Sequence, residues 1–124
     1  DIEHELSAKY DCAHGAGLAV VMPAVFSYYL KHNVNRFAQV ATRVWGCQMD
    51  FANPENTAKE GIEALRRFFI SIGMPKNFAE IDAKEEDIEE LAHLACYGDG
   101  RTGTIGGLVP LNQKDVENIY RLML

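Results

Sequence analysis

The chain has 124 residues, of which 48% are hydrophobic, and 18 acidic against 12 basic residues give it a net charge of −6. This length suits one domain with a sizeable core, and the acidic balance argues against binding to nucleic acid or to an anionic membrane surface. The longest apolar run, 16–26, is too short to span a bilayer, and the charged start DIEHE differs from a signal peptide. Because the three cysteines include no C-x-x-C pair, we expect reduced thiols in a cytoplasmic protein.

Apolar residues recur with helical spacing along most of the chain. A short helix over 2–10 carries His4, and residues 11–14 interrupt it before the next helix. Pro23 should kink that next helix, because proline removes a backbone donor. Three apolar stripes follow the helical period, and we interpret all of them as core: Leu18, Val21, Met22, Val25 and Tyr29; Phe37, Val40, Ala41, Val44 and Trp45; Ile62, Leu65, Phe69 and Ile72.

Capping residues predict where the middle helices begin and end. Asn53 followed by proline is typical of a helix start, and Gly73 with a proline just beyond it is typical of a helix end. Asp82 and Glu85 form a D-x-x-E capping box, which predicts a helix from there to about Cys96.

The last helix is predicted from Asn112, which serves as its N-cap, with Leu111 placed to contact Val116 across the first turn. No segment alternates apolar and polar residues, and no hairpin turn joins two β-rich runs. The sequence therefore predicts a single all-α domain, a bundle of about six helices spanning 1–124.

A glycine-rich segment, 98–103, spells G-x-G-x-x-G. That motif binds a dinucleotide only between a strand and a helix, whereas here it follows a helical segment. We interpret it as a loop in which Gly103, Gly106 and Gly107 supply positive φ angles. Because long loops in compact domains are often functional, a role beside an active site stays open.

Other charged residues are interpreted as solvated. The acidic run 84–90 suits the first turn of a helix, where acidic side chains complement the helix dipole. Arg66 and Arg67 form a pair on a charged helix face, and neither His32 nor His93 has a partner at ligand spacing.

Two histidines near the start of the chain could carry chemistry. His4 lies on the first short helix and His14 follows the break, with Gly15 allowing close backbone approach. Side chains on consecutive elements can converge on one centre, and imidazole suits Fe, Zn, Cu or Ni. Spacing alone leaves open a ligand or catalytic pair and two ordinary histidines, and Cys12 is interpreted as a buried thiol.

At these residues the sequence resembles a known family. The segment IEHELSAKYDCAHGAGLAVVMPA resembles the signature of the iron-containing (group III) alcohol dehydrogenases, in the butanol dehydrogenase branch. The similarity continues through NRFAQVATRVWG, EGIEALRRFFISIGMP and GTIGGLVPLNQKDVENIY, so it covers nearly the whole chain. Cys12 departs from the family, which usually has an aliphatic residue there.

The resemblance implies that the chain is the all-α, metal-bearing C-terminal domain of a two-domain enzyme whose N-terminal domain binds NAD(H) or NADP(H). In the family one aspartate and three histidines hold a divalent metal, Fe²⁺ or Zn²⁺. His14 matches the last of these ligands, and His4 matches a histidine beside the nicotinamide and the substrate. The other three ligands would lie upstream of Asp1. The glycine loop, with Gly106 and Gly107, would lie near the cleft, and Tyr10 and Cys12 would line the substrate pocket.

The implied reaction is hydride transfer between a small alcohol or aldehyde and the nicotinamide, with the metal as Lewis acid and His4 able to relay a proton. The parent would be a homo-oligomer, and this chain alone is expected to be inactive. The alternatives are a non-catalytic helical binding module and a sibling enzyme similar to glycerol dehydrogenase.

Overall fold

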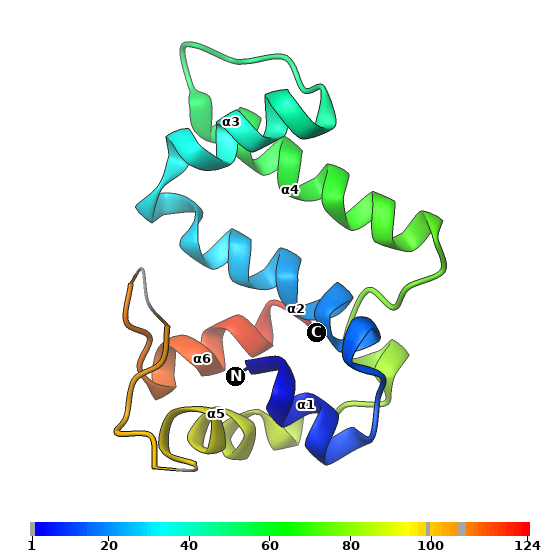
Figure 1. Ribbon diagram of the computed structural model, residues 1–124, viewed down its shortest axis with the longest axis vertical. Helices are drawn as coiled ribbons and strands as arrows, with labels where there is room; N and C mark the ends of the chain where they lie inside the picture. The colour runs from blue at the N-terminus through cyan, green and yellow to red at the C-terminus, as the bar shows by residue number, and fades with distance from the viewer. Residues whose placement is uncertain (1, 99, 107–108) are drawn as a thin grey trace. The chain divides into compact units, whose positions relative to one another are not determined.

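The structure is a computed structural model that describes residues 2–98, 100–106 and 109–124 (Figure 1). It contains α1 (Ile2–Tyr10), α2 (His14–Tyr29), α3 (Val34–Trp45), α4 (Pro54–Ser71), α5 (Ile88–Tyr97) and α6 (Gln113–Arg121). Short 3₁₀ turns, η1 (Leu30–His32), η2 (Ala79–Ile81) and η3 (Glu85–Asp87), lie between them. Within the described residues β pairing is limited to one isolated bridge between Ile105 and Leu111. The all-α prediction is confirmed.

The chain divides into two compact units, which are described separately. The first unit comprises residues 1–21 and 75–124, and the second unit comprises residues 22–74. Helix α2 contributes its first half to the first unit and its second half to the second. Among the helices the structure describes, none is long and apolar enough to cross a membrane.

The core of the first unit forms where α6 packs against α5 and the start of α1 (Figure 1). The Tyr120 ring is fully buried, and its hydroxyl donates a hydrogen bond to the Ile2 carbonyl oxygen over 2.7 Å. The Phe78 ring centroid lies 6.0 Å from that of Tyr120, and the Phe78 amide donates to the Met123 carbonyl. Buried aliphatic side chains from α1, α5 and α6 complete this core: Leu6, Ile88, Leu91, Val116 and Ile119.

The start of α6 agrees with its prediction. The Asn112 side chain accepts a hydrogen bond from the Asp115 amide over 2.9 Å, and the Asp115 side chain accepts one from the Asn112 amide over 3.0 Å. This reciprocal capping box satisfies two backbone donors that a helix start otherwise leaves unpaired.

The predicted start of α5 at Asp82 is wrong. Asp82 has a φ of +58° and ends η2, so its backbone belongs to the preceding turn. The chain is also drawn back there by a hydrogen bond from the Ala83 amide to the Phe78 carbonyl. The α-helix begins only at Ile88, after η3, and its end at Tyr97 lies one residue beyond the predicted one.

The second unit is centred on the pair α3 and α4, which lie side by side (Figure 1). A Cβ built on Gly61 would lie 2.5 Å from the Cβ of Ala41, so the two backbones approach closely where both side chains are small. Leu30, Ala38, Ala58 and Ile62 are buried beside this crossing. As predicted, α4 follows Asn53 and ends shortly before Gly73, although the Asn53 side chain makes no capping hydrogen bond.

The interpretation of the apolar stripes as core is wrong for several large residues. The side chains of Val40, Val44 and Ile72 are 42%, 65% and 56% exposed. For Val40 and Val44 the physical reason is the crossing itself, because α3 meets α4 at Ala41 and leaves its larger side chains beside the contact, whereas Ile72 lies just beyond the end of α4. Small residues at the crossing thus determine which face of α3 is buried.

Candidate functional site

The turn between α1 and α2 brings the two predicted histidines together. Helix α1 ends at Tyr10, Asp11 adopts a φ of +51°, and α2 begins at His14 after only three residues outside a helix. The Asp11 amide closes α1 by donating to the Ser7 carbonyl. As a result the ring centroids of His4 and His14 lie 5.6 Å apart, and the two ring planes are inclined by 36°. Ten positions separate these residues in the sequence. We call these residues, with Glu3, the corner cluster.

Glu3 is the member of the corner cluster that the sequence patterns did not reveal. Its side chain is buried, its Oε2 shares a hydrogen bond with His14 Nδ1, and its Oε1 accepts one from the Ser7 hydroxyl. Glu3 follows the helical period of Leu6 and Tyr10 at i+3 and i+7, which places it on the inward face of α1. That position was the available signal, since an acidic residue on an apolar face needs a partner.

The corner cluster has donor atoms that suit a transition metal. Ligand atoms of Glu3, His4 and His14 all lie within 4.8 Å of one another, and both histidines are exposed to solvent. Two imidazoles and a carboxylate are the ligand types that Fe²⁺ and Zn²⁺ accept. The imidazoles of this cluster therefore fit one side of a metal centre, and the Glu3 carboxylate, which shares a hydrogen bond with His14, fits as the partner of a ligand.

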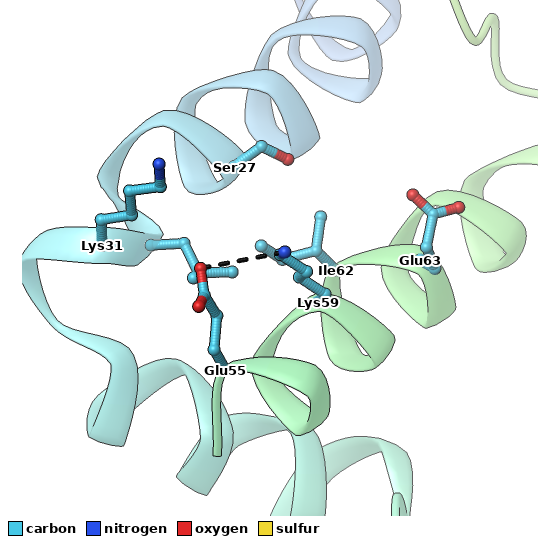
Figure 2. A pocket seen from close by; sticks show the side chains of 7 residues that line it. Ser27, Lys31, Glu55, Lys59, Ile62 and Glu63 are labelled. Atoms are coloured by element: carbon cyan, nitrogen blue, oxygen red, sulfur yellow. Dashed lines mark ion pairs between the residues drawn. The ribbon is translucent and has the colours of Figure 1, made fainter. Parts of the chain in front are cut away.

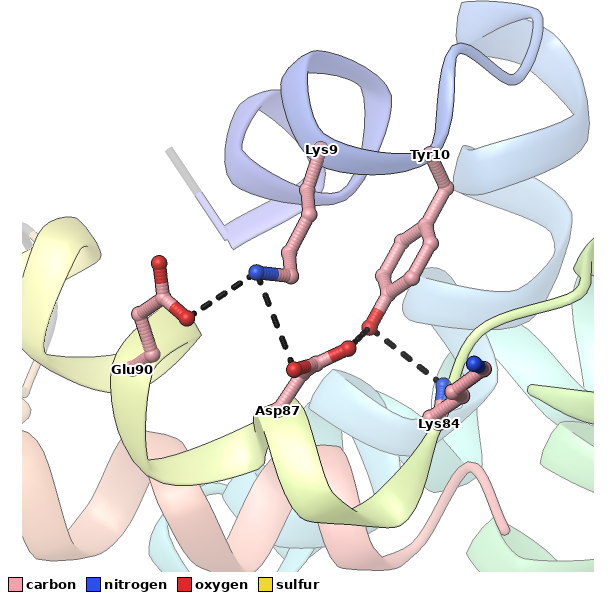
Figure 3. Close-up of polar contacts among 5 residues, drawn as sticks. All are labelled: Lys9, Tyr10, Lys84, Asp87 and Glu90. Carbon is pink, nitrogen blue, oxygen red and sulfur yellow. Dashed lines mark hydrogen bonds and ion pairs between the residues drawn. The ribbon is translucent and has the colours of Figure 1, made fainter.

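Tyr10 is held by polar contacts at the far end of α1 (Figure 3). Its hydroxyl donates to Asp87 over 2.5 Å and accepts from the Lys84 amide over 3.3 Å, while Lys9 lies 2.9 Å from a carboxylate oxygen of Glu90. Burial, together with the bond to Asp87, raises the pKa of Tyr10 above its ordinary value. These contacts fix the end of α1 to the segment that begins α5. They also engage Asp87 and Glu90, two residues of the acidic run 84–90 that was expected to be solvated.

Cys12 lies in the turn between α1 and α2 and is half-buried. Its Sγ is 4.0 Å from the Ser7 hydroxyl, the same hydroxyl that donates to Glu3. Cys12 therefore borders the corner cluster through Ser7.

The glycine-rich segment follows helix α5, as predicted, whereas dinucleotide binding requires that it follow a strand. Gly103 and Gly106 have φ angles of +114° and +93°, as expected, while Gly107 lies outside the described residues. Arg101 fixes the loop to α1, because its guanidinium lies 2.9 Å from a carboxylate oxygen of Glu5. The loop is thus tied to the helix that carries His4.

Two hollows lie within the second unit and hold none of the predicted site residues. One, of about 370 Å³, is bordered by charged side chains, among them the ion pair of Glu55 and Lys59 (Figure 2). The other, of about 250 Å³, is an apolar groove between α3 and α4 that includes Val40, Val44 and Leu65. Among the described residues that line these two hollows there is no histidine or cysteine.

Comparison with known proteins places this chain in a family. The model of the Fe-containing alcohol dehydrogenase family, C-terminal part, matches residues 1–124. The chain is 37% identical over 97% of its length to NADH-dependent butanol dehydrogenase A of Clostridium acetobutylicum, and covers 30% of that protein. It is 35% identical over its full length to the probable NADH-dependent butanol dehydrogenase 1 of Bacillus subtilis, covering 31% of it.

A solved structure agrees with this likeness. The NADH-dependent butanol dehydrogenase A of Thermotoga maritima superposes with a TM-score of 0.89 at 31% identity, over 98% of this chain and 31% of that one. The chain thus spans about a third of the length of the relatives it matches. The chain belongs to the Fe-containing alcohol dehydrogenase family and corresponds to its C-terminal part.

Proposed function

We propose that residues 1–124 form the metal-bearing helical domain of a longer alcohol dehydrogenase or aldehyde reductase that uses NAD(H) or NADP(H). The observation that carries this proposal is the corner cluster, in which His4 and His14 meet at the α1–α2 turn. The names of the relatives, NADH-dependent butanol dehydrogenases, support the reaction class. The nicotinamide cofactor would be bound mainly by an N-terminal domain equivalent to the part of the relatives that this chain does not cover.

His14 is proposed as a metal ligand and His4 as the residue beside the reacting groups. A bound Fe²⁺ or Zn²⁺ would supply Lewis-acid polarisation of the alcohol or aldehyde oxygen. His4 is exposed next to His14, so one of its ring nitrogens can take the proton lost by the alcohol, or return it to the product of aldehyde reduction. His4 lies on α1, which its hydrogen bonds with Asp87 and Tyr120 hold in place, and His14 begins α2 after a three-residue turn, so their relative positions are fixed.

The substrate pocket is proposed to include Tyr10, Cys12, Gly106 and Gly107. Because the Tyr10 hydroxyl is already engaged by Asp87, its contribution would come from the ring face. Gly106 is exposed on the loop that Arg101 ties to α1, so the loop can border the same cleft as the corner cluster.

The proposal is tested in the complete enzyme with His14→Ala, His4→Ala and a control, His93→Ala. His93 is exposed on α5 and stacks on Tyr97, outside the corner cluster. His14→Ala should lose both bound metal and activity, because it removes a ligand. His4→Ala should keep the metal but lower kcat about 100-fold or more, the usual scale for losing a proton-transfer group. A His14→Ala enzyme with full metal content would contradict the proposal.

A further inference from the structure

Glu3 is a buried acidic residue that the proposed ligand assignment does not use. We propose that Glu3 is a positioning residue, which holds the His14 ring in the tautomer whose Nε2 lone pair would be available to a metal. This inference rests on the proposed function, since it assumes that His14 is a ligand. It goes beyond that function by assigning a role to a side chain that touches neither substrate nor cofactor.

The hydrogen bonds of Glu3 define which His14 nitrogen is available. A carboxylate can only accept, so its bond to His14 Nδ1 requires the hydrogen of the neutral ring to sit on Nδ1. The lone pair is then on Nε2, the atom left to bind a metal. Histidine ligands commonly donate their second ring N–H to a carboxylate in this way. The Ser7 hydroxyl, one helical turn along α1, holds the other carboxylate oxygen in place.

The glycine at position 17 provides an independent observation. A Cβ built on Gly17 would lie 2.9 Å from Cδ of Glu3, too close for the carboxyl group to stay where it is. Gly17 therefore leaves room in the first turn of α2 for the Glu3 carboxylate, which explains the second glycine of the H-G-A-G segment. The absence of a side chain at Gly17 thus allows the Glu3 carboxylate to lie beside His14.

A purely structural role for Glu3 makes a different prediction. A carboxylate against the first turn of α2 also complements the helix dipole, so removing it would lower stability whatever His14 does. Only if Glu3 positions His14 would its removal also change the tautomer of His14 and the affinity for metal. The experiment must therefore measure those two properties.

The first measurement uses the metal-free complete enzyme with ¹⁵N-labelled histidine, in alkaline buffer where imidazole is neutral. His14→Ala identifies the signal of His14. We expect the Nδ1–H tautomer in the wild type and its loss in Glu3→Ala, whereas Glu89→Ala, at an exposed position of α5, should not change it. A wild-type His14 that carries its hydrogen on Nε2 would overturn the inference.

The second measurement is the dissociation constant for Zn²⁺. Glu3→Ala should weaken Zn²⁺ binding about 10- to 100-fold, the scale found for outer-shell partners of metal ligands. Gly17→Ala should weaken it too, but should add no further loss in the Glu3→Ala background, where the space is already vacated. This pair keeps the test valid if one variant folds poorly.

The outcomes separate the inference from the proposed function. If His14→Ala abolishes Zn²⁺ binding while Glu3→Ala and Gly17→Ala bind it like the wild type, the positioning role is wrong and the proposed function stands. If His14→Ala binds Zn²⁺ like the wild type, the proposed function itself fails, and the inference fails with it.

Discussion

Tyr120 of α6 donates a 2.7 Å hydrogen bond to the carbonyl oxygen of Ile2, and this bond joins the last helix to the first turn of the helix that carries His4. Tyr120→Phe would remove this buried hydrogen bond, while the Ile2 carbonyl keeps its helical partner in α1, so we expect a loss of about 0.5 to 1.5 kcal/mol of unfolding free energy. Denaturation by urea measures this loss. Tyr97→Phe is the control, because Tyr97 is 50% exposed and should change stability little.

The same phenol predicts how stability depends on alkaline pH. Burial raises the pKa of Tyr120 above the ordinary value of 10. Above pH 10 the unfolded chain therefore releases the phenol proton while the folded chain retains it, and stability falls as pH rises. The loss contributed by this group approaches about 1.4 kcal/mol per pH unit. Thermal denaturation at a series of pH values should show a shallower alkaline decline in Tyr120→Phe, and parallel curves would contradict the prediction.

Local patterns predicted the helices and several of their ends, whereas the backbone conformation of one turn and a contact across another account for the errors. The capping box at Asn112 was predictable because all its partners lie within one turn. The similar pattern at Asp82 failed because the preceding turn requires a positive φ at that residue. The sequence also indicated that His4 and His14 could form a pair. Glu3 was missed because its partner, His14, lies across the turn on α2.

The crossing of α3 and α4 predicts a strong effect of one methyl group. Gly61→Ala would place a Cβ 2.5 Å from that of Ala41 and 2.9 Å from its Cα, so the helices must separate. Although alanine favours helix, overpacking of this kind costs about 1 to 3 kcal/mol. Glu60→Ala, at the exposed neighbouring position, should stay within about 0.5 kcal/mol of the wild type. A stabilised Gly61→Ala protein would show that the two helices are not in close contact.

The ion pair of Arg101 and Glu5 predicts how firmly the glycine loop is held. The Arg101 and Glu5 side chains are only 23% and 15% exposed, so solvent screens their attraction less than that of a surface pair. The loop is also held by two backbone hydrogen bonds, from the Gly103 amide to the Cys96 carbonyl and from the Ile105 amide to the Leu111 carbonyl.

Arg101→Met keeps much of the apolar stem but removes the charge and the hydrogen bond that the guanidinium donates to the Leu94 carbonyl, and we expect about 1 kcal/mol less protection of the loop. Hydrogen exchange at the Gly103 and Ile105 amides should then be about 5-fold faster, because 1 kcal/mol changes a local opening equilibrium by that factor. Arg121→Met is the matched control, since the pair of Arg121 with Glu85 is long, at 3.9 Å, and more exposed. If both variants exchange at the wild-type rate, hydrogen bonds alone hold the loop, and the charge pair with α1 contributes nothing to its order.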